Sequence, residues 1–190
     1  MAKRSVSPVP DDAGLTGAVA ERLDALAPEG PLGLAVSGGS DSTALLHLAA
    51  RWAKARGRTL VVATVDHGLR PGSAAEARGV GRAAAALGLS HDTLTLGPLP
   101  PGNLQAAARE VRTSALAAWG RRRGLGAIAL GHTLDDQAET VAMRLLRGAG
   151  ADGLSAMRPA SRRAGTVWLR PLLGLRREAL RRWLTAQGIG

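Results

Sequence analysis

Strand-like and helix-like segments alternate along most of the 190-residue sequence. This alternation is typical of α/β folds, in which each helix crosses over a parallel sheet between two strands. We predict a doubly wound, mostly parallel five-stranded sheet with helices on both faces, of the Rossmann-like class. In such sheets, ligands bind at the carboxyl ends of the strands, where the strand order reverses. The predicted strands are residues 32–36, 59–65, 91–96, 127–130 and 166–169.

Helices are predicted at residues 40–56, 73–87, 104–119, 134–146 and 176–187. Apolar residues at helical spacing indicate which side of each helix faces the sheet. We expect residues 1–28 to form a flexible N-terminal arm and leading helix, and residues 29–190 to form one domain. The side of the 134–146 helix that we expect to face inward carries Ala138, Val141, Ala142 and Leu145.

Composition limits the classes of function. The sequence contains no cysteine, which excludes disulfides, thiolate metal sites and cysteine nucleophiles. No apolar run is long enough to span a bilayer, and the basic, proline-rich start lacks the apolar core of a secretion signal. We therefore expect a cytoplasmic protein with no membrane segment.

The formal net charge of +10 indicates a polyanionic partner. A GC-rich coding bias is the competing explanation, because lysine occurs only at Lys3 and Lys54 while arginine is abundant. The absence of Phe and Tyr argues against the aromatic stacking platforms of RNA-recognition domains.

Residues 37–42 read SGGSDS and lie between the first predicted strand and helix. Glycines permit positive φ and close approach of a ligand, and backbone N–H groups at a helix N-terminus bind anions. Asp41 would repel a phosphate unless a cation lies between them, which predicts Mg²⁺ bridging the two. The alternative is a serine-capped glycine turn. The predicted phosphate-binding residues are Ser37, Gly38, Gly39, Ser40, Asp41 and Ser42.

Residues 65–70 (VDHGLR) end the second predicted strand. Asp66, His67 and Arg70 would lie at the same edge of the sheet and contact the nucleotide or its phosphates. A strand-end turn, with Gly68 in the turn and Asp66 as a cap, explains these residues equally well.

Arg109 and Arg112 are three residues apart and therefore share one face of a predicted helix. Two guanidinium groups on an alanine-rich helix suit a phosphate group or an RNA backbone. A solvated helix face that pairs with Glu110 is the alternative.

Three acids follow the fourth predicted strand in GHTLDDQAET, residues 131–140. Asp135, Asp136 and Glu139 open a helix, where acids often act as caps. Three acids beside His132 exceed what capping needs, so we predict a site for an ammonium group, a metal ion or a protonated base.

These motifs resemble a known family. SGGSDS resembles the signature of the ATP-pyrophosphatases, which have an adenine nucleotide α-hydrolase type of fold. The segments that extend the resemblance to tRNA(Ile)-lysidine synthetases are VDHGLR, AREVR, GHTLDDQAETVAMRLLRGAGADGLSAM and RPLL, and together with SGGSDS they cover about residues 30–188.

The resemblance implies that residues 29–190 form a PP-loop ATP-binding catalytic domain. It implies a ligase that uses ATP and Mg²⁺ to adenylate the wobble cytidine of tRNA(Ile) at C2, releasing pyrophosphate, and then joins L-lysine there with loss of AMP. The implied ATP-binding residues are 37–42, Asp66, His67 and Arg109, with Asp41 on the metal. The implied catalytic residues are Asp41, Arg112, His132, Asp136 and Glu139, and the implied lysine-binding residues are Asp135, Asp136 and Glu139.

Two features depart from this family. Thr113 stands where the family usually has an aromatic residue, and the C-terminal tRNA-binding domains of the family are absent from the sequence. A homodimer is one possible assembly, but no pattern in the sequence identifies the oligomeric state. Two other hypotheses stay open: another SGGxDS synthetase with a small-molecule acceptor, or a non-catalytic nucleotide- or RNA-binding protein.

Overall fold

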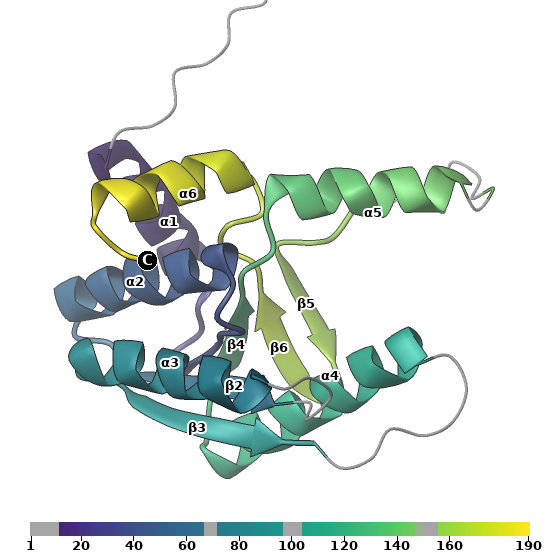
Figure 1. Cartoon of the computed structure of the whole chain (residues 1–190), viewed down its shortest axis with the longest axis horizontal. Coiled ribbons are helices and arrows are strands. Elements are labelled where there is room, and N and C mark those ends of the chain that lie inside the picture. Colours follow the sequence, from purple (N-terminus) through teal and green to yellow (C-terminus); the bar gives the residue numbers. More distant parts are fainter. Residues whose placement is uncertain (1–11, 67–71, 97–103, 147, 149–155) are drawn as a thin grey trace, which may run out of the picture.

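The computed structural model describes residues 12–66, 72–96, 104–146, 148 and 156–190. Helices and strands alternate as the sequence predicts (Figure 1). The helices are α1 (Asp12–Leu26), α2 (Ser40–Arg56), α3 (Ser73–Ala86), α4 (Leu104–Arg122), α5 (Leu134–Leu146) and α6 (Arg177–Ala186). The strands are β1 (Leu32–Ala35), β2 (Leu60–Asp66), β3 (Ser90–Thr95), β4 (Ala127–Leu130), β5 (Ala160–Arg163) and β6 (Thr166–Leu169).

The strands form one sheet in the order β3-β2-β1-β4-β6-β5. All neighbouring pairs are parallel except β5 with β6. Strand β1 has β2 on one side and β4 on the other, so the chain changes direction across the sheet between these strands. This is the switch point at which doubly wound sheets bind ligands. The predicted fold class is confirmed.

Within the described residues, the sheet has six strands rather than the predicted five. The additional strand is β5, whose sequence ASRR is polar and gives no apolar signal. It pairs with β6 through a two-residue turn at Ala164 and Gly165, both of which have positive φ (51° and 73°). Positive φ at both central residues is the feature of a type I′ hairpin turn, which glycine adopts easily and alanine rarely. An edge position explains why the strand tolerates polar residues.

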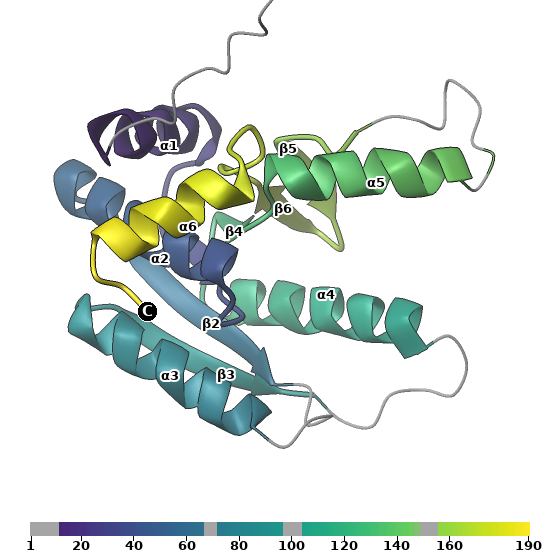
Figure 2. The same cartoon turned by 45° about the horizontal axis from the view of Figure 1, so that its top comes forward.

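Side chains that alternate along the strands build a core on each face of the sheet. Leu34 and Val62 belong to the larger cluster, together with residues of α1, α2, α3 and α6. Ile128 and Trp168 belong to the smaller cluster, which includes residues of α4. Figure 2 accordingly shows α4 on the opposite side of the sheet from α2 and α6. Trp119 of α4 packs directly over Gly33, where a Cβ would lie 2.8 Å from the indole.

Helix α1 packs on the larger cluster through Leu15, Val19 and Leu23, all fully buried. Residues 12–26 therefore contribute to the same hydrophobic core as the sheet. No helix in the described ranges is both long and apolar enough to cross a membrane.

The prediction of which side of α5 faces inward is wrong. Ala138, Ala142 and Leu145 are exposed, and α5 has no buried residue. The helix extends outward beyond the sheet (Figure 1), and among the described residues its side chains Met143, Leu145 and Leu146 are exposed. Periodicity predicts an amphipathic helix correctly, but it cannot show whether a partner surface is present.

Candidate functional site

A cavity of about 390 Å³ lies at the switch point of the sheet. Its walls come from the loop after β1, from α4, from the loop after β4, from the β5–β6 hairpin and from α6. This position matches the sequence-based expectation that functional residues follow the strands. The predicted residues that line the cavity are Ser37, Gly39, Ser40, Asp41, Ser42, Arg109, Arg112, His132 and Asp136.

The loop at residues 37–39 is exposed and leads into the N-terminus of α2. Gly38 has φ of +87°, a conformation that favours glycine, and Gly39 is the N-cap of α2. No side chain caps this helix end. Backbone N–H groups at an uncapped helix end, beside a cavity, are suited to bind an anion.

Ser42 has a different role from the other serines. It is buried, its hydroxyl donates to the carbonyl of Gly39 at 2.9 Å, and it accepts the backbone N–H of Ser37 at 3.1 Å. Its hydroxyl is therefore engaged in shaping the loop. Gly131 at the end of β4 packs against it, since a Cβ on Gly131 would lie 3.0 Å from the Cα of Ser42.

Asp136 combines a capping role with a second contact. Its Oδ2 accepts hydrogen bonds from the backbone N–H (2.6 Å) and the hydroxyl (2.8 Å) of Thr133, the arrangement of a capping box at the start of α5. Its Oδ1 accepts from Arg177 at 3.0 Å. Burial raises the pKa of Asp136, but the hydrogen bonds from Thr133 and the charge of Arg177 outweigh it, so the pKa is lowered overall.

Asp135 faces a different element. Its Oδ2 accepts the backbone N–H of Arg177 at 2.7 Å and so caps the N-terminus of α6. The side chain does not line the cavity. The adjacent acids of the DDQ motif therefore point to different partners, and Gln137 binds a third, the backbone of Met157.

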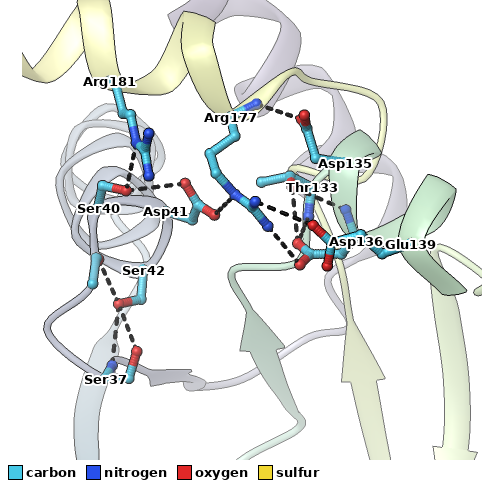
Figure 3. A network of polar contacts seen from close by, with 11 residues as sticks. Ser37, Ser40, Asp41, Ser42, Thr133, Asp135, Asp136, Glu139, Arg177 and Arg181 are labelled. Atoms are coloured by element: carbon cyan, nitrogen blue, oxygen red, sulfur yellow. Dashed lines mark hydrogen bonds and ion pairs between the residues drawn. The ribbon is translucent and has the colours of Figure 1, made fainter.

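Arg177 joins the acids at the centre of the site (Figure 3). Its Nε donates to Asp41 at 3.0 Å, its Nη2 to Asp136 at 3.0 Å and its Nη1 to Glu139 at 3.3 Å. The hydrogen bond with Asp41 is the main cause of a raised Arg177 pKa. We call Asp41, Asp136 and Glu139 the acid cluster.

The acid cluster by itself does not form a site for the expected Mg²⁺. In the part of the chain that the structure describes, no group of three or more His, Asp or Glu side chains is placed to hold a metal ion. Asp41 directly follows the glycine loop in the sequence and lines the cavity with it. A single carboxylate fits Mg²⁺ only if phosphate oxygens and water supply the other ligands, as is common for Mg²⁺ bound with a nucleotide.

Among the arginines that line the cavity are Arg109, Arg112 and Arg170. None of the three forms an ion pair with a described carboxylate. Burial first, and then repulsion from Arg109, lower the pKa of Arg112 and that of Arg170. Guanidinium groups that are gathered without counter-ions favour an anionic ligand. We call these residues the arginine cluster.

His132 lies beside the arginine cluster. Burial, followed by repulsion from Arg170, lowers its pKa to about 4, so the imidazole is neutral at pH 7. Its Nδ1 and the Nε of Arg170 are buried without a hydrogen-bond partner among the described residues. Buried polar atoms without partners are unusual in proteins and are suited to contact a ligand.

The structure does not bring all predicted residues to the cavity. Asp66 ends β2 but does not line it, and Glu139 reaches the site only through Arg177. His67 and Arg70 lie outside the described residues. Thr113, the departure from the family pattern, lines the cavity and donates to the carbonyl of Arg109 at 2.8 Å.

Sequence reasoning missed the residues that β5, β6 and α6 contribute to the cavity. The most important of these residues is Arg177, and one feature of the sequence could have drawn attention to it. It begins a helix, where a positive charge opposes the helix dipole by roughly 0.3–1 kcal/mol. The missed lining residues are Ser161, Arg163, Trp168, Arg170, Arg177 and Arg181.

Comparison with known sequences supports the resemblance. A family model described as a PP-loop domain matches residues 16–190. The chain is 54% identical over 159 residues to the tRNA(Ile)-lysidine synthase of Ruegeria pomeroyi and 51% identical over 168 residues to that of Hyphomonas neptunium. These alignments cover 83% and 84% of this chain, but 38% and 45% of the relatives. The chain therefore spans less than half the length of these two proteins.

Comparison with solved structures supports the fold. The U34-tRNA thiolase NcsA from Methanococcus maripaludis, solved with its [4Fe-4S] cluster, is similar over 92% of this chain and 62% of its own, with a TM-score of 0.78 and 17% identity. The NH3-dependent NAD synthetase from Campylobacter jejuni is similar over 92% of this chain and 71% of its own, with a TM-score of 0.57 and 14% identity. Because this sequence contains no cysteine, it has no thiolates with which to hold such a cluster.

Proposed function

Because the chain belongs to the PP-loop domain family, whose members use ATP, we propose that it is the catalytic part of a tRNA(Ile)-lysidine synthase. In the proposed reaction, the C2 oxygen of the wobble cytidine attacks the α-phosphorus of ATP and pyrophosphate leaves. The ε-amine of lysine then attacks C2, and the C2 oxygen leaves with AMP. The ammonium group loses one proton before the attack and a second as the new carbon–nitrogen bond forms, so that the nitrogen keeps one hydrogen.

The main support for this proposal is that one cavity is lined both by the arginine cluster and by Asp41 and Asp136 of the acid cluster. The glycine loop and the arginine cluster suit a triphosphate, and the acid cluster suits an ammonium group. An enzyme that activates an acceptor with ATP and then attacks it with an amine needs both regions within reach of one reacting centre.

Roles for individual residues follow from this arrangement. We assign the ATP phosphates to residues 37–42 and to the arginine cluster. The further nucleotide contacts Asp66 and His67 rest on the family resemblance alone. Asp41 would hold Mg²⁺, which would offset the charge of the phosphates when bound. Asp136 and Glu139 would bind the lysine ammonium group, and Asp135 would support them by holding α6. Neutral His132 would donate or accept a hydrogen bond at the reacting centre.

The test is pyrophosphate release with ATP, L-lysine and a tRNA(Ile) transcript that has a CAU anticodon. We expect lysine-dependent release of pyrophosphate and AMP, reduced at least 100-fold in Asp41→Ala and Glu139→Ala, since removing groups that bind the transition state typically costs two or more orders of magnitude. Glu178→Ala is the matched control, because Glu178 is exposed and, among the described residues, forms its ion pair with exposed Arg182 of the same helix. Release of ADP, or full activity in both acid variants, would contradict the proposal.

A further inference from the structure

Arg177 occupies the positions in the acid cluster that a cationic substrate would need. Each of its three guanidinium nitrogens donates to a different carboxylate, and these come from α2 and α5. Its side chain is 29% exposed, while those of Asp41 and Asp136 are 19% and 25% exposed. The acids proposed to bind the lysine ammonium group are thus already paired with a cation of the protein itself.

A guanidinium group and an ammonium group compete directly for these oxygens. A lysine ammonium group has three N–H donors and no acceptor, so it needs the same kind of carboxylate partners as Arg177. Oδ2 of Asp136 is engaged by Thr133 in the capping box, which leaves Oδ1 for one strong ionic partner. A lysine ammonium group therefore competes with Arg177 for Oδ1 of Asp136 and Oε1 of Glu139.

The surroundings of Arg177 offer its side chain a second anionic partner. The backbone of Arg177 is held by Asp135, so the start of α6 stays fixed while the long side chain can rotate. The guanidinium also lines the same cavity as Gly39 and Ser40 of the glycine loop. Phosphate groups bound at that loop would offer the guanidinium charged oxygens that it can bind in a bidentate manner.

Resting on the proposed function, we infer that Arg177 is a positioning residue that sets the order of substrate binding. It neutralises the acid cluster while no nucleotide is bound and turns to the phosphates when ATP arrives. The turn frees Asp136 and Glu139 for the amine. Lysine consequently binds well only after ATP, which prevents the amine from occupying the site before an activated acceptor can form.

The test is calorimetric titration of L-lysine into the protein, with and without a non-hydrolysable ATP analogue and Mg²⁺. In the wild type, we expect the analogue to tighten lysine binding by about ten-fold or more, a usual size for coupling between two sites. In Arg177→Gln, lysine should bind without the analogue, and the coupling should fall to about two-fold or less. Arg177→Lys keeps the charge and should retain part of the coupling.

Arg182→Gln is the matched control, since Arg182 lies on the same helix and pairs with exposed Glu178. It should show the wild-type coupling. Melting curves establish that each variant is folded before titration, and Arg177→Lys provides the test if Arg177→Gln does not fold.

The outcomes separate the inference from the proposed function. If lysine binds and Arg177→Gln keeps the wild-type coupling, the inference is wrong while the function stands. If the analogue binds but lysine binds neither protein under any condition, the lysine-binding function fails, and the inference with it. Equal lysine affinity with and without the analogue in the wild type also overturns the inference.

Discussion

His132 provides a quantitative test of the buried cationic environment in the cavity. Its pKa is lowered from 6.5 to about 4, chiefly because burial disfavours the charged imidazolium and secondarily because Arg170 repels it. Replacement by glutamine keeps a polar side chain that can hydrogen-bond but removes the titrating group. The perturbation is therefore His132→Gln, followed as a function of pH.

The sign of the expected effect follows from the two pKa values. Between pH 6.5 and about 4, the unfolded chain binds a proton at His132 and the folded chain does not, so protonation favours unfolding. The contribution of neutral His132 to the free energy of unfolding is fully present above pH 6.5 and decreases as the pH falls toward 4. At about 1.4 kcal/mol for each pKa unit, the shift corresponds to an upper limit of about 3 kcal/mol.

The assay is urea unfolding of both proteins at several pH values from 7.5 to 4.5. The wild type should lose more free energy of unfolding than His132→Gln over this interval. His47 and His91 also have pKa values lowered by burial, but both are present in the two proteins and cancel in the comparison. Parallel stability curves, or an NMR titration that places the pKa of His132 above 6, would refute this reasoning.

Two further predictions concern packing around the cavity. Gly131→Ala places a Cβ 3.0 Å from the Cα of Ser42, so we expect a loss of about 1–3 kcal/mol in the free energy of unfolding, with weaker binding of an ATP analogue. Gly79→Ala is the control, because its new Cβ has no neighbour closer than 3.9 Å, and it should lose neither stability nor binding of the ATP analogue. Equal melting temperatures for the two variants would contradict this account. Asp135→Ala removes the acceptor of the Arg177 backbone N–H at the start of α6. It should lower the free energy of unfolding, measured by thermal melting, by about 0.5–2 kcal/mol, and Asp135→Asn should be closer to the wild type. A loss of lysine binding without any loss of stability would instead make Asp135 a substrate-binding residue.

The fold could be predicted because its central strands carry strong local signals. LGLA in β1 and AIAL in β4 are apolar at every position, as expected for strands covered on both faces. Because the predicted strands are parallel, the SGGSDS and GHTLDDQ segments that follow them are expected at the same edge of the sheet. The structure adds that β1 and β4 are neighbours. The shared helix face of Arg109 and Arg112 could be predicted in the same way, because helical spacing alone puts them on one face.

The centre of the site could not be predicted in the same way. Arg177 contacts Asp41 across 136 positions of sequence and reaches Asp136 and Glu139 only because α6 packs over α2 beside the start of α5. No local pattern contains that packing. The sequence-based interpretation of the acids was also too simple, since Asp135 caps α6 while Asp136 both caps α5 and binds Arg177.

The charges around the cavity explain why ligand binding should displace one side chain in particular, that of Arg177. The arginine cluster has no described carboxylate partner, whereas Arg177 has three. An anion that enters can therefore bind the arginine cluster without breaking an existing ion pair. A cation that enters must first break the contacts of Arg177, which is unfavourable until another anion is available to receive that guanidinium. The asymmetry favours the polyanion as the first ligand and the amine as the second.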